Sequence, residues 1–150
     1  MIKAIKLVLK EDTILDLYFL DGSVKRYDVL SLADKFPQLE QLKDRQLFLK
    51  GRLMGFGGVV FNDELDIGAE TIYDEGIDVS VESDDIEIVV FGYRIKEERL
   101  KREMSQEELA AKIGIDQADL SKIEKGQANP SYKMMKRIAI GLNRSLILDL

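Results

Sequence analysis

The chain has 150 residues, of which 45% are apolar and 33% charged, and its net charge is −6, which allows one large domain or two small ones with packed cores. It contains no Cys and no His, which excludes disulfides, thiolate or His-based metal sites and a Ser-His-Asp triad. No stretch approaches the roughly 18 apolar residues of a membrane span, and we expect a soluble, cytoplasmic protein that is not an enzyme and uses no cofactor and no metal.

Three strand patterns begin the chain. Residues 2–10, 13–20 and 23–30 are rich in β-branched, aromatic and other apolar side chains, a composition typical of strands. Asp21-Gly22 separates the second pattern from the third. This dipeptide favours a tight hairpin with a type I′ turn, in which both central residues need a positive φ.

A second hairpin is expected from residues 46–54 and 58–62, which flank a glycine-rich turn at 55–58. This glycine run resembles a phosphate-binding loop only superficially, because it lacks the Lys and the following helix. Between the two hairpins, residues 31–44 are expected to be helical or irregular, with Pro37 near a helix start.

An acidic region follows the second hairpin. Residues 69–75 are expected to form a short helix and residues 76–83 a linker. The segment from Asp63 to Glu87 carries 11 acidic residues and no Lys or Arg. We interpret it as a solvated face, with repulsion of DNA or binding of a basic partner protein as the second interpretation. A calcium site is the third, but the spacing of an EF-hand loop is absent.

Charge is divided unevenly along the chain. Residues 1–92 carry 10 Lys/Arg and 19 Asp/Glu, a net charge of −9, whereas residues 93–150 carry 12 and 9, a net charge of +3. This asymmetry, with a helical pattern from about Phe91 onward, predicts two domains with different partners. We expect an α+β domain of antiparallel hairpins with short helices at 1–82 and an all-α domain of four to five helices at 83–150.

Three stretches of the N-terminal part carry a resemblance: Phe19-Leu-Asp-Gly-Ser, Phe36-Pro-Gln-Leu and the run from Gly58 to Tyr73. They are similar to a small bacterial α+β family of unknown function, whose members occur alone or fused ahead of a helix-turn-helix domain. Phe61 stands where that family often has Trp. Some relatives look like antitoxins paired with a small toxin. The resemblance implies sensing, dimerisation or partner binding by this domain.

Capping and turn signals organise the C-terminal part. Ser105 with Glu108 fits a capping box, and Gly114 suits a left-handed helix end. Asp116 and Ser131 are expected to cap two further helices. Two short helices joined by a tight turn containing Gly have the layout of a helix-turn-helix. Apolar residues at helical spacing predict its core: Leu109, Ala110, Ile113, Leu120 and Ile123.

Residues 91–149 resemble the Cro/CI repressor-type (XRE) family of helix-turn-helix domains. The resemblance rests on residues 104–110, the Gly114 turn, residues 120–126 and Asn129-Pro-Ser131. It implies a sequence-specific DNA-binding transcriptional regulator whose second motif helix enters the major groove of double-stranded DNA.

The same resemblance implies roles for single residues. The base-reading positions are Gln117, Ala118, Ser121 and Lys122. The positions near the DNA backbone are Gln106, Lys125, Gln127, Asn129 and Lys133. Gln suits adenine, Lys suits guanine and Ala suits a thymine methyl group, whereas backbone contacts set the register. Glu124 matches a structural position with an internal bond.

Two features depart from the pattern expected of a DNA-binding helix-turn-helix. Asp116 and Asp119 place carboxylates at the start of the second motif helix, where we interpret them as a cap and as a complement to the helix dipole. Contact with a cytosine amino group is the alternative. The apolar residues at the chain end are expected to pack on the domain or to supply a dimer contact: Leu142, Leu146, Ile147, Leu148 and Leu150.

Three functions are open on this basis. We prefer a repressor that binds a near-palindromic operator as a homodimer, because such readers pair two half-sites about 34 Å apart. The alternative is an antitoxin-type regulator, whose N-terminal domain binds a toxin, another protein or a small ligand while the C-terminal domain regulates its own operon. The third is an adaptor that no longer reads DNA, which Asp116 and Asp119 favour.

Overall fold

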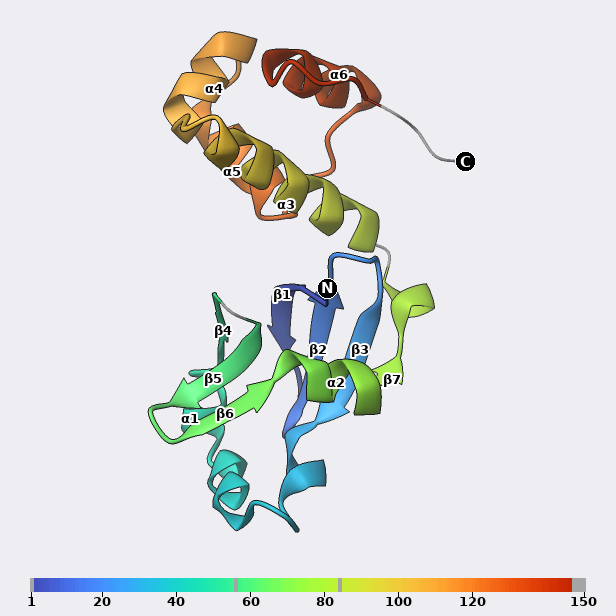
Figure 1. Ribbon diagram of the computed structural model, residues 1–150, viewed down its shortest axis with the longest axis vertical. Helices are drawn as coiled ribbons and strands as arrows, with labels where there is room; N and C mark the ends of the chain where they lie inside the picture. Colours follow the sequence, from blue (N-terminus) through green and yellow to red (C-terminus); the bar gives the residue numbers. More distant parts are fainter. Residues whose placement is uncertain (1, 56, 84, 147–150) are drawn as a thin grey trace. The chain divides into compact units, whose positions relative to one another are not determined.

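The computed structural model describes residues 2–55, 57–83 and 85–146 (Figure 1). The chain divides into two compact units, Met1–Ile86 and Glu87–Leu150, called here the N-terminal unit and the C-terminal unit. The first contains antiparallel sheets with short helices and the second contains helices, as the sequence predicts. No helix in the described part of the chain is long and apolar enough to cross a membrane.

The first sheet of the N-terminal unit has four antiparallel strands in the order β1-β2-β3-β7 (Figure 1). Its strands are β1 (Ala4–Leu9), β2 (Ile14–Phe19), β3 (Val24–Asp28) and β7 (Ile77–Asp78). The first three follow the three strand patterns of the sequence. The inner strand β2, which pairs with β1 and β3, is the most buried of them.

The turn between β2 and β3 differs from the predicted type. Phe19 N donates to Ser23 O at 2.9 Å, which closes a loop of Leu20, Asp21 and Gly22. Only Gly22 has a positive φ, of 90°. Asp21 Oδ1 accepts from Ser23 N at 2.8 Å, a local bond that stabilises this longer loop. The hairpin is therefore confirmed, but the type I′ turn is wrong.

The interpretation of residues 76–83 as a linker is also wrong, because β7 pairs with β3 inside the first sheet. Beyond β7, the chain remains bonded to the first sheet. Asp85 accepts hydrogen bonds from Lys6 Nζ at 3.2 Å and Tyr18 OH at 3.1 Å. Burial opposes ionisation of Asp85, but hydrogen bonds from Ser83 and Lys6 outweigh it and lower the pKa of this carboxyl.

The second sheet has three antiparallel strands: β4 (Arg52–Met54), β5 (Gly58–Asn62) and β6 (Leu65–Gly68). The hairpin of β4 and β5 confirms the prediction for the glycine-rich turn, but its first strand is shorter than predicted. The strand β6 was not predicted from the sequence. It starts where Asn62 Oδ1 accepts from Leu65 N at 2.9 Å and reverses the chain.

Short helices connect and cover these sheets. They are the 3₁₀ helices η1 (Val29–Leu32), η2 (Pro37–Lys43) and η3 (Ser80–Glu82), and the α-helices α1 (Arg45–Phe48) and α2 (Ala69–Glu75). Pro37 starts η2 and α2 has the predicted bounds. The helix α1 replaces the start of a predicted strand, because Asp44 Oδ1 caps it by accepting from Gln46 N at 3.0 Å.

One apolar core joins both sheets. In it, the rings of Phe48 and Phe61 stack with centroids 5.7 Å apart, and Phe19 meets Tyr73 edge to face at 4.9 Å. Its fully buried side chains come from β2, η1, η2, α1, β5 and α2: Leu15, Leu17, Val29, Leu42, Phe48, Val59 and Ile72.

The C-terminal unit contains α3 (Ile86–Lys101), α4 (Gln106–Ile113), α5 (Gln117–Glu124) and α6 (Tyr132–Gly141). In the described residues of this unit, these four helices fall within the predicted four to five, although α3 starts before the predicted Phe91. Leu142 is 1% exposed and packs in the core of this unit. Leu146 is half-buried. The remaining residues of this prediction, Ile147, Leu148 and Leu150, lie outside the described residues.

Candidate nucleic-acid interface

The helix α4 begins and ends with the predicted signals. Ser105 Oγ accepts from Glu108 N at 3.0 Å, and Glu108 Oε1 accepts from Ser105 N at 3.4 Å, which forms a capping box. Gly114 takes the left-handed conformation, with φ 74° and ψ 39°. Arg137 also donates to the carbonyl of Ile113 at this end of the helix. Both ends of α4 are thus fixed by local bonds.

The turn between α4 and α5 corrects one prediction. Asp116 occupies the N-cap position of α5, but its side chain makes no capping hydrogen bond. Its carbonyl accepts from Asp119 N and Leu120 N, each at 3.1 Å. Asp116 and Asp119 are both exposed. The two carboxylates therefore stay at the surface, at the start of the helix that the sequence assigns to base reading.

The two motif helices share the predicted core. All five of its residues are at most 8% exposed: Leu109, Ala110, Ile113, Leu120 and Ile123. The helix α3 covers this core and passes close to the end of α5. A Cβ atom on Gly92 would overlap the carbonyl oxygen of Ile123 and lie 3.0 Å from that of Glu124. Gly92 therefore permits the close contact of α3 with α5.

A buried ion pair joins the same two helices. Arg99 Nε and Nη2 donate to the two carboxylate oxygens of Glu124, at 2.8 and 2.9 Å. The exposed fractions are 6% for Arg99 and 7% for Glu124. The hydrogen bonds that the Arg99 guanidinium donates to Glu124 raise its pKa. This bidentate geometry fixes α5 on α3, and it confirms the internal bond predicted for Glu124.

A chain of hydrogen bonds through two glutamines links this ion pair to the surface. Gln106 Nε2 donates to Glu124 Oε1 at 3.1 Å, and Gln117 Nε2 donates to Gln106 Oε1 at 2.7 Å. The path runs from buried Arg99 through half-buried Gln106 to exposed Gln117. It holds the first side chain of α5 in one orientation.

The structure brings the predicted base-reading residues together on the outer side of α5. Gln117, Ala118 and Lys122 are exposed and Ser121 is half-buried. On the other side of the helix, Leu120 is fully buried and Ile123 is 5% exposed. The outer side of α5 is therefore available to a partner, and its inner side is held by the core.

The predicted backbone-contact residues surround α5. Gln106 lies at the start of α4, Lys125, Gln127 and Asn129 follow α5, and Lys133 lies in the first turn of α6. All are exposed except Gln106, which is half-buried. Ser131 Oγ caps α6 as predicted, by accepting from Met134 N at 3.1 Å.

Two arginines that position the motif were not predicted from the sequence. Arg99 bonds Glu124 and the Met104 carbonyl, the latter at 2.8 Å, and Arg137 bonds the end of α4. A signal existed for Arg99, because it lies one helical turn after buried Ile95. A charged side chain at a core spacing indicates a buried partner of opposite charge.

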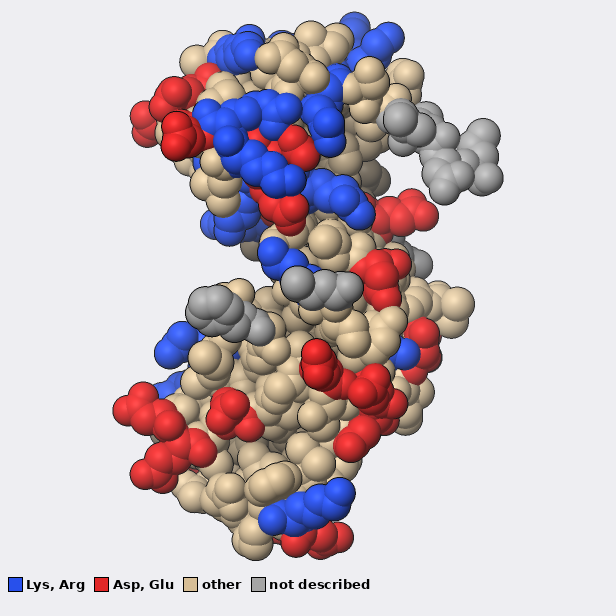
Figure 2. All heavy atoms as spheres, viewed as in Figure 1, with Lys and Arg blue, Asp and Glu red and all other residues tan. Residues whose placement is uncertain are grey.

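Charge is distributed differently on the two units. On the face drawn in Figure 2, Lys and Arg gather over the C-terminal unit, whereas Asp and Glu are more numerous over the N-terminal unit. This agrees with the sequence counts. A cationic surface attracts the phosphates of a nucleic acid, and an anionic surface repels them.

Among solved structures, the chain is similar to the crystal structure of a putative DNA-binding protein from Nitrosomonas europaea. The TM-score is 0.43 and the identity 16%, over 92% of this chain and 84% of that chain.

Curated relatives match about a third of the chain. An uncharacterized HTH-type transcriptional regulator from Archaeoglobus fulgidus is 43% identical over 53 residues, which are 35% of this chain and 75% of the relative. Another from Methanothermobacter thermautotrophicus is 38% identical over 56 residues, 37% of this chain and 81% of the relative. The ImmF control region 10 kDa protein of Bacillus phage phi105 is 40% identical over 55 residues, 37% of this chain and 61% of the relative.

The family model described as helix-turn-helix matches residues 95–148. This range includes α4, the tight turn, α5 and α6, and so the whole predicted interface. Through this part the chain belongs to the helix-turn-helix family of transcriptional regulators.

Proposed function

We propose that this protein is a transcriptional repressor that binds a near-palindromic operator as a homodimer, with α5 in the major groove. The observation that carries the proposal is the exposed side of α5, whose first side chain, Gln117, is held by Gln106. A single short helix contacts few base pairs. Two copies on two half-sites about 34 Å apart supply the missing specificity.

Gln117, Ala118, Ser121 and Lys122 are proposed to contact bases. The amide of Gln117 is suited to the edge of adenine, and Lys122 to the O6 and N7 atoms of guanine. Gln106, Lys125, Gln127, Asn129 and Lys133 are proposed to contact the sugar-phosphate backbone and to set the register. The carboxylates of Asp116 and Asp119 reduce the positive potential of the protein surface at the start of α5, which would face the major groove. They therefore favour modest affinity of each copy for DNA.

The test is in vitro selection of DNA sequences by the full-length protein at low salt. We expect enrichment of a near-palindromic motif whose half-sites are about one helical turn, or a small multiple of one, apart. Enrichment of an unpaired half-site would contradict the dimer. If no sequence motif is enriched, the result would contradict sequence-specific DNA binding and favour the adaptor.

Replacing Lys122 with alanine should relax the base preference at one position of each half-site. The expected cost is about 1–3 kcal/mol on the selected operator and little on unrelated DNA. The matched variant is Lys133→Ala, which removes the same charge at a proposed backbone position. It should weaken all sequences alike and flatten the salt dependence of binding. Equal effects of both substitutions on operator and unrelated DNA, measured by fluorescence anisotropy over a salt series, would contradict the division of roles.

The second candidate is an antitoxin-type regulator that binds a basic protein through its N-terminal domain and regulates its own operon. The favouring observation is the net charge of −9 over residues 1–92, which suits a cationic partner and not DNA. A neighbouring gene for a small basic protein that forms a complex with this chain would support this candidate.

A further inference from the structure

The strand β6 leaves one edge of the second sheet uncovered. The sheet order is β4-β5-β6, so β6 pairs with β5 on one side only. Ala69 N donates to Gly57 O at 2.9 Å, in register with the pairs Val59↔Ile67 and Val60↔Asp66. Because bonded and non-bonded pairs alternate in an antiparallel ladder, the N–H and C=O of Asp66 point away from β5. Within the described part of the chain, no hydrogen bond to these two groups is seen.

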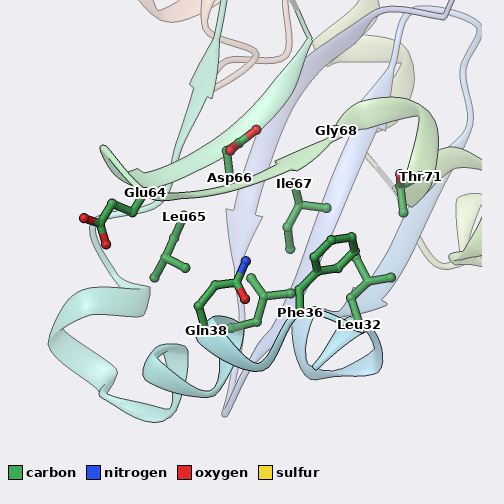
Figure 3. Close-up of a pocket in the computed structure, with 10 residues that line it drawn as sticks. Leu32, Phe36, Gln38, Glu64, Leu65, Asp66, Ile67, Gly68 and Thr71 are labelled. Carbon is green, nitrogen blue, oxygen red and sulfur yellow. The ribbon is translucent and has the colours of Figure 1, made fainter. Parts of the chain in front are cut away.

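A pocket lies along this open edge. Its volume is about 300 Å³, and its walls come from η1, η2, β6 and the start of α2. In Figure 3, Leu65 and Ile67 point from β6 towards Gln38 and Phe36, while Asp66 points to the opposite face. Phe36 is 48% exposed, although it lines the pocket beside the buried side chains of Leu65 and Ile67. The edge thus offers a pocket whose lining is mostly apolar but includes Gln38, Glu64 and Thr71, and the side chain of Asp66 points to the other face.

The surroundings of the edge are acidic. Asp63, Glu64, Asp66 and Glu70 are all exposed. None of the described residues that line the pocket is Lys or Arg. The side chains of a strand alternate between two faces. A strand added beside β6 would therefore place every second side chain in the pocket and the others near Asp66.

We propose that this edge, called here the β6 groove, binds an extended segment of a partner protein by strand addition, and that the segment alternates apolar with Lys or Arg residues. Main-chain bonds to Asp66 would supply affinity, and the pocket and the carboxylates would supply specificity. A second copy of this chain is disfavoured, because β6 beside β6 would bring the exposed carboxylates Glu64 and Asp66 of the two copies together. The proposal assigns a surface to the N-terminal unit and does not depend on DNA reading.

The test measures binding of synthetic peptides of about eight residues, the length of an ordinary strand, to the full-length protein. The probe peptide alternates lysine with valine and leucine and carries a fluorescent label. The first control has the same composition in two blocks, and the second has glutamate in place of lysine. We expect the alternating lysine peptide to bind at least about tenfold more tightly than either control. If the block peptide binds as tightly as the alternating one, binding depends only on net charge, and strand addition is overturned.

Variants of the protein locate the peptide. The double substitution Glu64→Lys/Asp66→Lys should weaken binding by at least about tenfold. The matched control Glu11→Lys/Asp74→Lys makes the same charge change at exposed positions outside the groove and should leave binding unchanged. Equal losses from both pairs would overturn the assignment to β6.

One further substitution tests the main-chain bond directly. Asp66→Pro removes an N–H that points away from β5, so the existing sheet loses no hydrogen bond. Thermal unfolding should stay near that of the parent, while peptide binding is lost. Retained binding in a folded Asp66→Pro variant would contradict strand addition. Assembly of the unliganded chain through this edge, abolished by the same substitution in sedimentation experiments, would show that the occupant is a second copy.

Discussion

Replacing Arg99 with methionine is expected to lower the free energy of unfolding of the C-terminal unit by about 3–5 kcal/mol. The Glu124 side chain is 2% exposed, and methionine leaves its charge buried with one donor, Gln106 Nε2 at 3.1 Å. The Met104 carbonyl also loses its bond from Arg99. Urea unfolding followed by far-ultraviolet circular dichroism reports this change, because the long helices lie in this unit.

Two controls separate the ion pair from side-chain size and surface charge. The double variant Arg99→Met/Glu124→Met removes both charges and should recover most of the loss, since apolar replacement of a whole buried pair is often neutral. Lys101→Ala removes a cation of the same helix that is 64% exposed and should cost less than about 1 kcal/mol. A single variant within about 1 kcal/mol of the parent would show that Glu124 is neutralised or solvated without Arg99.

Replacing Gly92 with alanine is expected to destabilise the C-terminal unit by about 3 kcal/mol, although alanine is the better helix former by about 1 kcal/mol. The added Cβ would overlap the carbonyl oxygen of Ile123, a backbone atom that cannot rotate aside. The helices α3 and α5 must then separate, which also stretches the Arg99–Glu124 pair. Operator binding should weaken together with stability, because the same contact positions α5.

Gly55→Ala is the control for this substitution. Leaving aside its two chain neighbours, no described residue has an atom within 4 Å of a Cβ built on Gly55. We therefore expect a change of no more than about 1 kcal/mol, in the stabilising direction if any. Chemical denaturation of both variants gives the comparison. A Gly92→Ala protein as stable as its parent would mean that α3 shifts along α5 without loss of packing.

The helix-turn-helix could be predicted from sequence because local signals define its parts. The capping box of Ser105 and Glu108 and the left-handed Gly114 depend on residues at most a few positions apart. The same reasoning failed at Asp116, which has the N-cap position without the side-chain bond. Propensity identifies a residue type suited to a position, but the rotamer depends on the surroundings.

Features that depend on distant residues could not be predicted. Arg99 meets Glu124 only after α3 packs on α5, and β6 is a strand because β5 lies beside it. Residues 76–83 contain Gly, Ser and acidic residues, from which a linker is predicted. Part of this segment nevertheless completes a sheet begun by β1, β2 and β3. For two of the residues proposed to contact DNA, Gln106 and Gln117, sequence suggested the roles, and the structure adds the hydrogen bonds that hold them.

If Gln117 contacts a base as proposed, its bond to Gln106 also affects how that recognition is divided between entropy and enthalpy. A free glutamine side chain loses up to about 2 kcal/mol of rotamer freedom when it is immobilised. In this protein Gln117 Nε2 already donates to Gln106 at 2.7 Å, so much of that freedom is lost during folding and not during association. One of its two amide hydrogens is also committed, which leaves a single donor and the carbonyl oxygen for a base. The free protein thus presents one fixed donor-acceptor pair, and a base edge of the wrong pattern cannot be accommodated by turning this side chain without breaking its bond to Gln106.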